Sequence, residues 1–432
     1  MRVKQHLAAA AVSAGLFVPF SAHATNGYQL IGVGSLQKGV AGAVTAMPES
    51  AMTAITNPAG MARIGNRTDF SMEAFLPEPT MDFTGSFGEK ADSAVSMYGI
   101  PALGWTAPVS DEHSNVYFGG GIYGTSGLGV DYGSTLMAPA AASPFGADTY
   151  YEGYSSISFW QMAPTLAWNS SDRLSLGVSL NIDYQAVAFM QRFQLDTDAT
   201  PGPDTTAVNF DLSRGAQAFG YGLTFGALFD VNDKLTLGAT YKSKQYFPDL
   251  EYQLGYGDIQ NIQTSNCPGV CPAGTYKMDL DYPQQLAAGL AYRVTSAVTV
   301  SADVKWIDWS STMSEIKISG PSGTRVTMPA GWSDQTVYAI GVKWAASPRV
   351  NLRAGYNYAK SPIDEKDVDN NYILPGIVES HYTIGGDYAL NKYWDLAFHY
   401  MYAPEVTLKS PTTNAEIGLS EQSVGINIGY KF

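Results

Sequence analysis

The chain has 432 residues, of which 45% are hydrophobic and 15% charged, and its formal net charge is -14. Because nucleic acid is itself an anion, this acidic balance argues against a nucleic-acid partner. After residue 24 no run of about 18 apolar residues occurs, which excludes a membrane-spanning helix.

Residues 1–24 have the layout of a secretory signal peptide. Arg2 and Lys4 supply a positively charged start, an apolar stretch follows, and residues 22–24 (Ala-His-Ala) form a small-residue cleavage site. The mature protein is therefore expected to begin near Thr25. Export without a spanning helix leaves two classes: a periplasmic or secreted globular protein, or a closed β-barrel in the outer membrane of a Gram-negative bacterium.

Residues 25–65 do not follow a strand pattern. They are rich in small residues, show helical spacing in places, and carry the stop signal Asn57-Pro58 near their end. A large barrel with an empty lumen leaks water and ions. We therefore expect this segment to fold into the lumen as a small N-terminal plug.

Residues 66–432 repeat one unit, a polar turn followed by a long alternating strand. In residues 174–185, for example, large apolar residues occupy one face and serine, glycine, asparagine, aspartate and glutamine the other. This period of two continues well beyond the usual length of a globular strand. We count roughly fourteen such segments, and single-chain bacterial barrels have an even number. The sequence predicts an all-β, antiparallel transmembrane barrel with short turns on the periplasmic side.

The end of the chain supports the barrel. Residues 423–432 alternate between polar and apolar side chains and finish on Phe432. We expect the apolar face to contact outer-membrane lipid and lipopolysaccharide, and the terminal aromatic residue to be read by the barrel-assembly machinery. Tryptophans near segment ends fit interfacial girdles around a monomeric barrel. A large periplasmic β-sandwich or propeller is the alternative that periodicity leaves open.

Motifs typical of enzymes and metal sites are weak. Gly119, Gly121 and Gly124 match a dinucleotide-binding pattern, but no helix follows them. The acidic residues 363–372 lack the glycine and the final glutamate of a calcium-binding loop, so a solvated outer loop is predicted, with surface binding of divalent cations as the lesser alternative. The sequence predicts no catalytic residues, no cofactor and no metal site.

The chain contains a single pair of cysteines, Cys267 and Cys271. In an exported protein this spacing favours a disulfide across a tight loop. A metal or redox site is the alternative, although the neighbourhood offers few further ligands.

Short motifs along the chain resemble one family. They are GYQL near the expected mature start, ITNPAG before the first strand, WTAPV in the second, then DWS, SPID and the aromatic C-terminus. In this order they resemble the outer-membrane long-chain fatty acid transporters, a family that includes aromatic-hydrocarbon uptake channels (FadL/TodX type). The resemblance implies a 14-stranded barrel with an N-terminal hatch, which passes hydrophobic molecules by diffusion.

The resemblance also implies a route of release. In the family the third strand is kinked and opens the wall, and residues 118–132 are the matching segment here. Its glycines weaken strand pairing and permit bulges. The residues expected at the lateral exit are Gly121, Gly124, Gly127 and Gly129, and those expected to gate it from the hatch are Tyr28, Asn57 and Pro58. A close approach of the plug to a glycine-rich strand is the alternative reading.

Cargo recognition is expected at two places. Residues 127–156 are predicted to form a long outer loop with few charges, in which Leu136, Met137 and Phe145 capture cargo or else pack on neighbouring loops. A fatty acid also needs cations for its carboxylate, although each candidate could instead pair with a lumen carboxylate. Strand parity points three of these candidates into the lumen, namely Lys305, Lys343 and Arg353, and the other two, Arg192 and Arg325, lie near loop ends.

The function predicted from the sequence is passive uptake of a long-chain fatty acid or similar amphiphile through the outer membrane. Uptake of a neutral or aromatic hydrocarbon is the alternative within the same class. Two alternatives from other classes are a lipase-like barrel enzyme and a structural or adhesive barrel.

Overall fold

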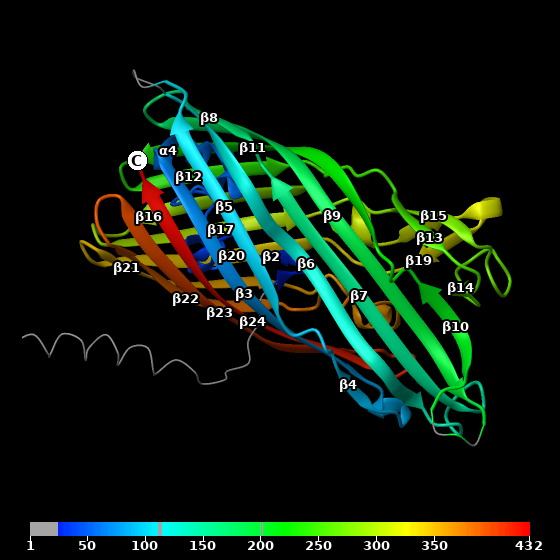
Figure 1. The fold of residues 1–432 in the computed structure, drawn as a ribbon. Helices are drawn as coiled ribbons and strands as arrows, with labels where there is room; N and C mark the ends of the chain where they lie inside the picture. Colours follow the sequence, from blue (N-terminus) through cyan, green and yellow to red (C-terminus); the bar gives the residue numbers. More distant parts are fainter. Residues whose placement is uncertain (1–24, 111–114, 199, 201) are drawn as a thin grey trace, which may run out of the picture.

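The computed structural model describes residues 25–110, 115–198, 200 and 202–432, so the predicted signal peptide lies outside the described residues. Among the described residues, no helix is both long enough and apolar enough to cross a membrane. The described strands form a closed antiparallel barrel with 14 spans (Figure 1). The predicted fold class is confirmed.

Each span follows its neighbour in sequence order around the ring. The fourth span consists of β7 and β8, which are separated by Ala163 and Pro164. The spans are β3 (Arg67–Asp82), β5 (Tyr98–Pro108), β6 (Val116–Ala138), β7 (Asp148–Met162) with β8 (Thr165–Asn169), β9 (Leu174–Asp196), β11 (Ala216–Asn232), β12 (Leu235–Lys242), β16 (Gln285–Arg293), β17 (Val298–Ile307), β20 (Gln335–Ser347), β21 (Val350–Ala359), β22 (Ser380–Ala389), β23 (Trp394–Lys409) and β24 (Glu416–Lys431).

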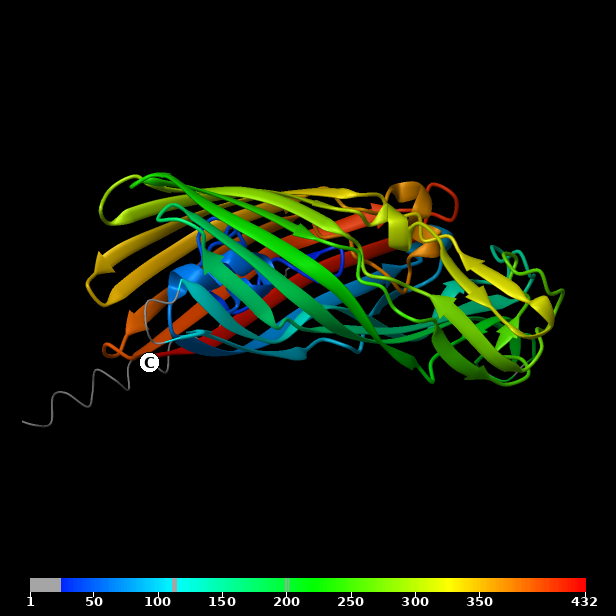
Figure 2. The same ribbon diagram turned by 90° about the horizontal axis from the view of Figure 1, so that it is seen from above.

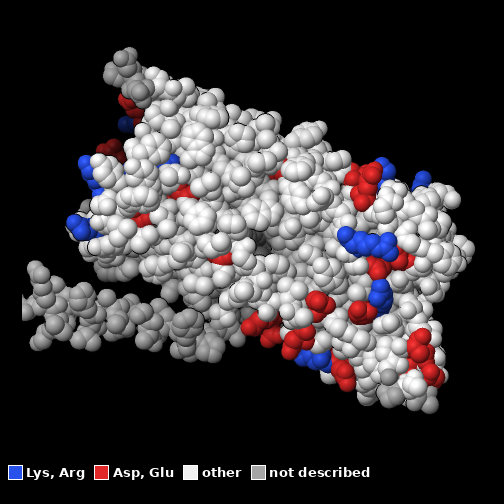
Figure 3. All heavy atoms as spheres, in the orientation of Figure 1, with Lys and Arg blue, Asp and Glu red and all other residues white. Residues whose placement is uncertain are grey.

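The ring closes where β24 pairs with β3, from Glu416 opposite Asp82 to Lys431 opposite Arg67. On β24 the apolar side chains of Ile426 and Ile428 are exposed, whereas Asn427 between them is buried in the lumen. Charged side chains gather toward the two ends of the molecule and are sparse between them (Figure 3). The outward apolar face of the alternating pattern therefore contacts lipid.

The segment from residue 25 to residue 65, hereafter the N-terminal segment, lies inside the ring near the end that carries the C-terminus (Figures 1 and 2). Its helix α2 contacts β22, β23 and β24, and its 3-10 turn η1 contacts β9 and β11 on the opposite wall. The elements of the segment are β1 (Thr25–Asn26), β2 (Gln29–Leu30), α2 (Ser35–Lys38), α3 (Thr53–Thr56), η1 (Pro58–Gly60) and α4 (Met61–Ile64).

The opposite end of the barrel carries the long connections (Figure 2). There, β13, β15, β18 and β19 form a separate four-stranded sheet. The elements of this end are η2 (Thr84–Ser86), β4 (Lys90–Asp92), β10 (Thr205–Asp211), β13 (Leu250–Leu254), β14 (Ile259–Gln260), β15 (Gly274–Asp279), α5 (Ser310–Met313), β18 (Ile316–Ser319), η3 (Pro321–Gly323), β19 (Arg325–Met328) and η4 (Glu365–Asn370).

The prediction of one long loop over residues 127–156 is wrong. Strand β6 continues to Ala138 and β7 begins at Asp148, so the connection between them is short. The strands persist because β6 finds a partner in β7 along this whole length, with irregular register near Tyr132 and Leu136. Glycines and small polar residues interrupt the alternation here and hide the strand in the sequence.

Candidate functional site

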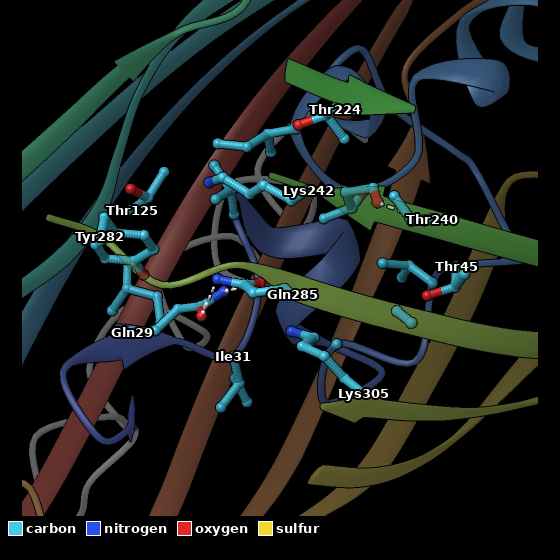
Figure 4. A pocket seen from close by; sticks show the side chains of 18 residues that line it. Gln29, Ile31, Thr45, Thr125, Thr224, Thr240, Lys242, Tyr282, Gln285 and Lys305 are labelled. Carbon is cyan, nitrogen blue, oxygen red and sulfur yellow. Dashed lines mark hydrogen bonds between the residues drawn. The ribbon is translucent and has the colours of Figure 1, made fainter. Parts of the chain in front are cut away.

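A small cavity, hereafter the lumen cavity, lies between the N-terminal segment and the wall. Its volume is about 60 Å³, and it is lined by Gln29 and Leu30 of β2 and by Lys242 and Lys305 of β12 and β17 (Figure 4). A water molecule in the liquid occupies about 30 Å³, so this cavity has room for only a few waters.

Both lysines bring positive charge to the cavity. The Lys242 ammonium donates a hydrogen bond to Gln161 Oε1 (2.7 Å) and lies 5.3 Å from the centre of the Tyr282 ring. Within the described part of the chain, neither lysine forms an ion pair with a carboxylate. The neighbouring carboxylate of Asp303 instead accepts hydrogen bonds from the backbone N–H groups of Val44 (2.9 Å) and Thr45 (2.8 Å). The cavity therefore presents cationic donors that an anionic group can still use.

Aromatic rings cover the cavity on its outer side. Tyr28 lies 4.6 Å from the Trp309 ring, 5.8 Å from Tyr282 and 5.9 Å from Trp332, measured between ring centres. Phe159 stacks on Tyr282 at 4.3 Å. These residues form a buried aromatic cluster, hereafter the aromatic cluster, which is a dry, apolar surface above the lysines.

The wall is open beside β6. Pairing between β5 and β6 ends at Ala102 opposite Tyr123, whereas β6 continues along β7 and β5 continues along β3. The open edge of β6 is used by the N-terminal segment, because β2 pairs with it at Ser126 and the Gly127 N–H donates to Tyr28 O (3.0 Å). The N-terminal segment therefore covers a gap between the second and third spans.

A second cavity, hereafter the gap cavity, has a volume of about 110 Å³ and occupies this gap. Its lining includes Leu30, Tyr98, Ile100, Gly124 and Gly127. Leu30 also lines the cavity that contains the lysines. Leu30, a buried side chain of the N-terminal segment, thus borders both cavities.

The model of one protein family covers nearly the whole chain. The family of outer membrane transport proteins described as OMPP1/FadL/TodX matches residues 17–429. The chain belongs to this family. The resemblance predicted from the sequence is confirmed, and the protein is assigned to the outer membrane as a transporter of the FadL/TodX type.

Individual relatives are distant in sequence but similar over their full length. Outer membrane protein P1 of Haemophilus influenzae is 21% identical over 446 residues, which cover 90% of this chain and 91% of that protein. A crystal structure of the toluene transporter TodX of Pseudomonas putida gives a TM-score of 0.71 at 20% identity and covers 94% of this chain and 100% of that one. A FadL homologue of Pseudomonas aeruginosa gives 0.71 at 17% identity, with 94% and 100% covered. These structures share the FadL-type barrel with this chain.

The residues expected at the exit and in the hatch lie at separate places in the structure. Gly124 and Gly127 line the gap cavity, Gly121 is still paired with β5, and Gly129 packs beside Tyr98. Tyr28 belongs to the aromatic cluster. Asn57 and Pro58 lie far from the gap, against β9 and β11, where the Asn57 side chain donates to Thr45 O (2.7 Å) and Ala227 O (3.1 Å). Asn57 and Pro58 therefore anchor the N-terminal segment to the barrel wall.

The residues expected to capture cargo are spread over the outer end. Leu136 and Met137 belong to β6, and Met137 packs on the main apolar core. Phe145 lies in the short β6–β7 connection with 50% of its surface exposed. The outer end also contains the disulfide between Cys267 and Cys271.

Of the cations expected to bind a carboxylate, only Lys305 lines the cavity. Arg192 pairs with Asp211 (2.5 Å), and Arg325 lies exposed in the outer sheet. Lys343 and Arg353 both pair with Glu49 of the N-terminal segment, and Arg353 also pairs with Asp387 (2.6 Å). Lys343 and Arg353 thus hold the segment in the barrel.

Sequence reasoning missed Lys242. On β12, Gly238, Thr240 and Lys242 are two residues apart and so share one face of the strand. Gly238 faces the N-terminal segment, and Thr240 does so too, because its hydroxyl donates a hydrogen bond to Thr56 O (3.0 Å). The parity rule that pointed Lys305 into the lumen therefore also applies to Lys242. Its place at the end of the strand, next to a polar turn, concealed this.

The wall is shaped to the N-terminal segment. A side chain at Gly177 would collide with the backbone of Ala59, one at Gly226 with the Asn57 amide, and one at Gly238 with Thr45 O. These are close approaches in which only glycine leaves room for a neighbouring chain. The segment and the wall therefore form one packed unit.

The Glu49 carboxylate is held charged. Burial alone would raise its pKa, but the charges of Arg353 and Lys343 lower it to about 2 from the ordinary value of 4.5. Because the folded-state pKa is depressed, the stabilisation is fully present above about pH 4.5 and is lost as the pH falls toward 2. The difference corresponds to roughly 3 kcal/mol.

We expect the variant Glu49→Gln to unfold more easily than the parent protein at pH 7, by roughly 3 kcal/mol, since the variant leaves Lys343 without its partner. This difference should shrink steadily as the pH falls from about 4.5 to 2. The measurement is the free energy of unfolding of the purified barrel at several pH values. The matched control is Glu365→Gln, because Glu365 is exposed in η4. A difference that does not depend on pH would contradict the assignment.

Proposed function

We propose that this transporter passes long-chain fatty acids or similar amphiphiles across the outer membrane by diffusion, without a cofactor and without catalysis. The observation that carries the proposal is the pair Lys242 and Lys305. Buried cations are costly unless they are paired. Beneath the dry aromatic surface, Asp183 and Asp303 act electrostatically on Lys242 and Lys305, but among the described residues neither carboxylate forms an ion pair with a lysine. A fatty acid supplies the carboxylate for the lysines and an alkyl chain for the apolar surface.

Capture begins at the outer end. We assign first contact to Leu136, Met137 and Phe145, which offer apolar surface there. The alkyl chain then replaces contacts within the aromatic cluster, and each buried methylene contributes about 0.8 kcal/mol. Affinity should therefore rise with chain length until the apolar surface is filled.

We assign release to the gap beside β6. Leu30 of β2 lines both the lumen cavity and the gap cavity. A shift of β2 therefore joins the two cavities without removing the N-terminal segment from the barrel. Exit between β5 and β6 keeps the alkyl chain away from water and delivers it to the membrane. The anchors of the segment at Glu49 and Asn57 join other strands than β6, namely β20, β21 and β11, and need not break.

Neutral aromatic hydrocarbons are the second candidate cargo, and the aromatic cluster favours them. Rings stack well on Tyr28, Trp309 and Tyr282 and make no demand on the lysines. The similar structure of TodX is described as that of a toluene transporter.

The deciding experiment compares uptake of radiolabelled oleate and toluene in a strain that lacks the gene and in the same strain with the gene restored. We expect restoration to raise oleate uptake more than toluene uptake. Equal rates with and without the gene for both compounds would overturn the proposal, and a rise for toluene alone would select the second candidate.

Closing the gap should block release. We expect Gly127→Leu to fill the gap cavity and to lower uptake strongly, while oleate still binds to the purified barrel. The control is Gly133→Leu on the same strand, because a side chain at Gly133 meets no atom within 4 Å. Uptake is measured in cells and binding by fluorescence of a fatty-acid analogue. Normal uptake by Gly127→Leu would instead support passage through the N-terminal segment.

A further inference from the structure

The start of the predicted mature chain is buried inside the barrel. Thr25 is 3% exposed and Asn26 is 0% exposed, and together they form β1, which pairs with β2. Cleavage after Ala24 adds water to the peptide bond, so that the carboxylate remains on Ala24 and Thr25 gains an amine that takes up a proton. Removal of the signal peptide therefore leaves a positive charge at a buried position.

A buried carboxylate lies beside Thr25. Glu421 of β24 is 3% exposed, and its Oε1 accepts a hydrogen bond from Thr25 Oγ1 at 2.6 Å. The two basic side chains of the N-terminal segment are engaged elsewhere, because Lys38 pairs with Glu73 and Arg63 with Asp230. The amine of Thr25 is thus the remaining cation of the segment.

His381 and Asn26 are polar neighbours of the same residue. His381 Nε2 lies 3.0 Å from Thr25 O; since a carbonyl only accepts, this nitrogen donates and Nδ1 is left as an acceptor. Among the described residues, Asn26 Oδ1 has no hydrogen-bond partner. An ammonium group has donors to spare for such acceptors, whereas a peptide N–H has one.

We infer that Glu421 is the binding site for the N-terminal ammonium of the processed chain, and that this ion pair fixes the β1–β2 hairpin. The hairpin carries Leu30, which borders both the lumen cavity and the gap cavity. Signal-peptide removal thus completes the closed form of the transporter. The inference rests on cleavage after Ala24 and not on the identity of the cargo, so its test is independent of the proposed function.

The test is the pKa of the Thr25 amine in the purified barrel. Only the unprotonated amine reacts with isotope-labelled formaldehyde and a reducing agent, so the rate of labelling as a function of pH, read by mass spectrometry of the N-terminal peptide, gives this pKa. The ordinary value is about 7.7–8.0. We expect the parent protein to titrate roughly one unit or more above Glu421→Gln, because the carboxylate stabilises the charged amine.

Two further variants make the result decisive. Glu416→Gln, on the same strand but partly exposed and paired with Lys409, should match the parent protein. Insertion of Ser-Gly between Ala24 and Thr25 leaves Glu421 in place but moves the ammonium away, and should give the ordinary pKa even if Glu421→Gln does not fold. A first residue other than Thr25, or equal pKa values in the parent, Glu421→Gln and insertion proteins, would overturn the inference.

Discussion

Replacing Lys242 and Lys305 together with methionine is expected to weaken the binding of a long-chain fatty acid by about 100-fold, because a hydrogen bond to a charged group contributes about 1.5–3 kcal/mol and each 1.4 kcal/mol is a factor of ten. Methionine keeps most of the length of the lysine stem, so the cavity retains its shape. The measurement is a titration of the purified barrel with a fluorescent fatty acid, accompanied by uptake in cells. The single variants should each lose about tenfold by the same reasoning.

The matched control for this experiment is Lys244→Met. Lys244 lies two residues beyond Lys242 but is paired with Asp281 at 2.8 Å, so it has no charge to offer the cavity. Toluene uptake should be unchanged in all of these variants. Unaltered fatty-acid binding in the double variant would remove the main support for an anionic cargo.

Tethering β2 to the wall is expected to stop transport. Gln29 and Ser126 are directly opposite in the pairing of β2 with β6, and directly opposite residues have Cβ atoms about 4.5–5.5 Å apart, so a disulfide between Gln29→Cys and Ser126→Cys needs only a small adjustment. The oxidised protein should neither enlarge the lumen cavity nor open the gap. Uptake of oleate should be lost in the oxidised double variant and should return after reduction.

The native disulfide between Cys267 and Cys271 sets the controls for the tethering experiment. The parent protein and each single-cysteine variant must be measured with and without the reducing agent, since reduction also opens the native bond. Full uptake by a completely oxidised double variant would show that the cargo passes without movement of β2.

The wall was predictable because its pattern is local. Alternation of side chains along a strand requires no knowledge of the partner strand, and residues such as Ile426 and Asn427 take opposite faces whatever lies beside them. The site was harder to predict because it is assembled from distant residues. Tyr28, Tyr282, Trp309 and Trp332 come from separate parts of the chain, and the spacing along the chain does not encode their contacts.

The errors have specific physical causes. Lys343 and Arg353 were placed in the lumen correctly by strand parity, but parity cannot show that Glu49 of another segment occupies them. The strand ending at Ala138 was missed because small residues erase the alternation where pairing with β7 alone maintains the strand. Sequence patterns therefore indicate which face a side chain takes, but not which partner it meets there.

The glycines that face the N-terminal segment fit the inner surface of the barrel to the shape of that segment. Gly177, Gly226 and Gly238 are vacancies in the inner surface that fit the path of one particular backbone. An N-terminal segment taken from a relative that is only 20% identical has different side chains at these positions. A chimera of that segment with this barrel should therefore pack poorly, even when both parent proteins fold well. Substitutions in the N-terminal segment should therefore require matching substitutions in the barrel wall, both in evolution and in protein engineering.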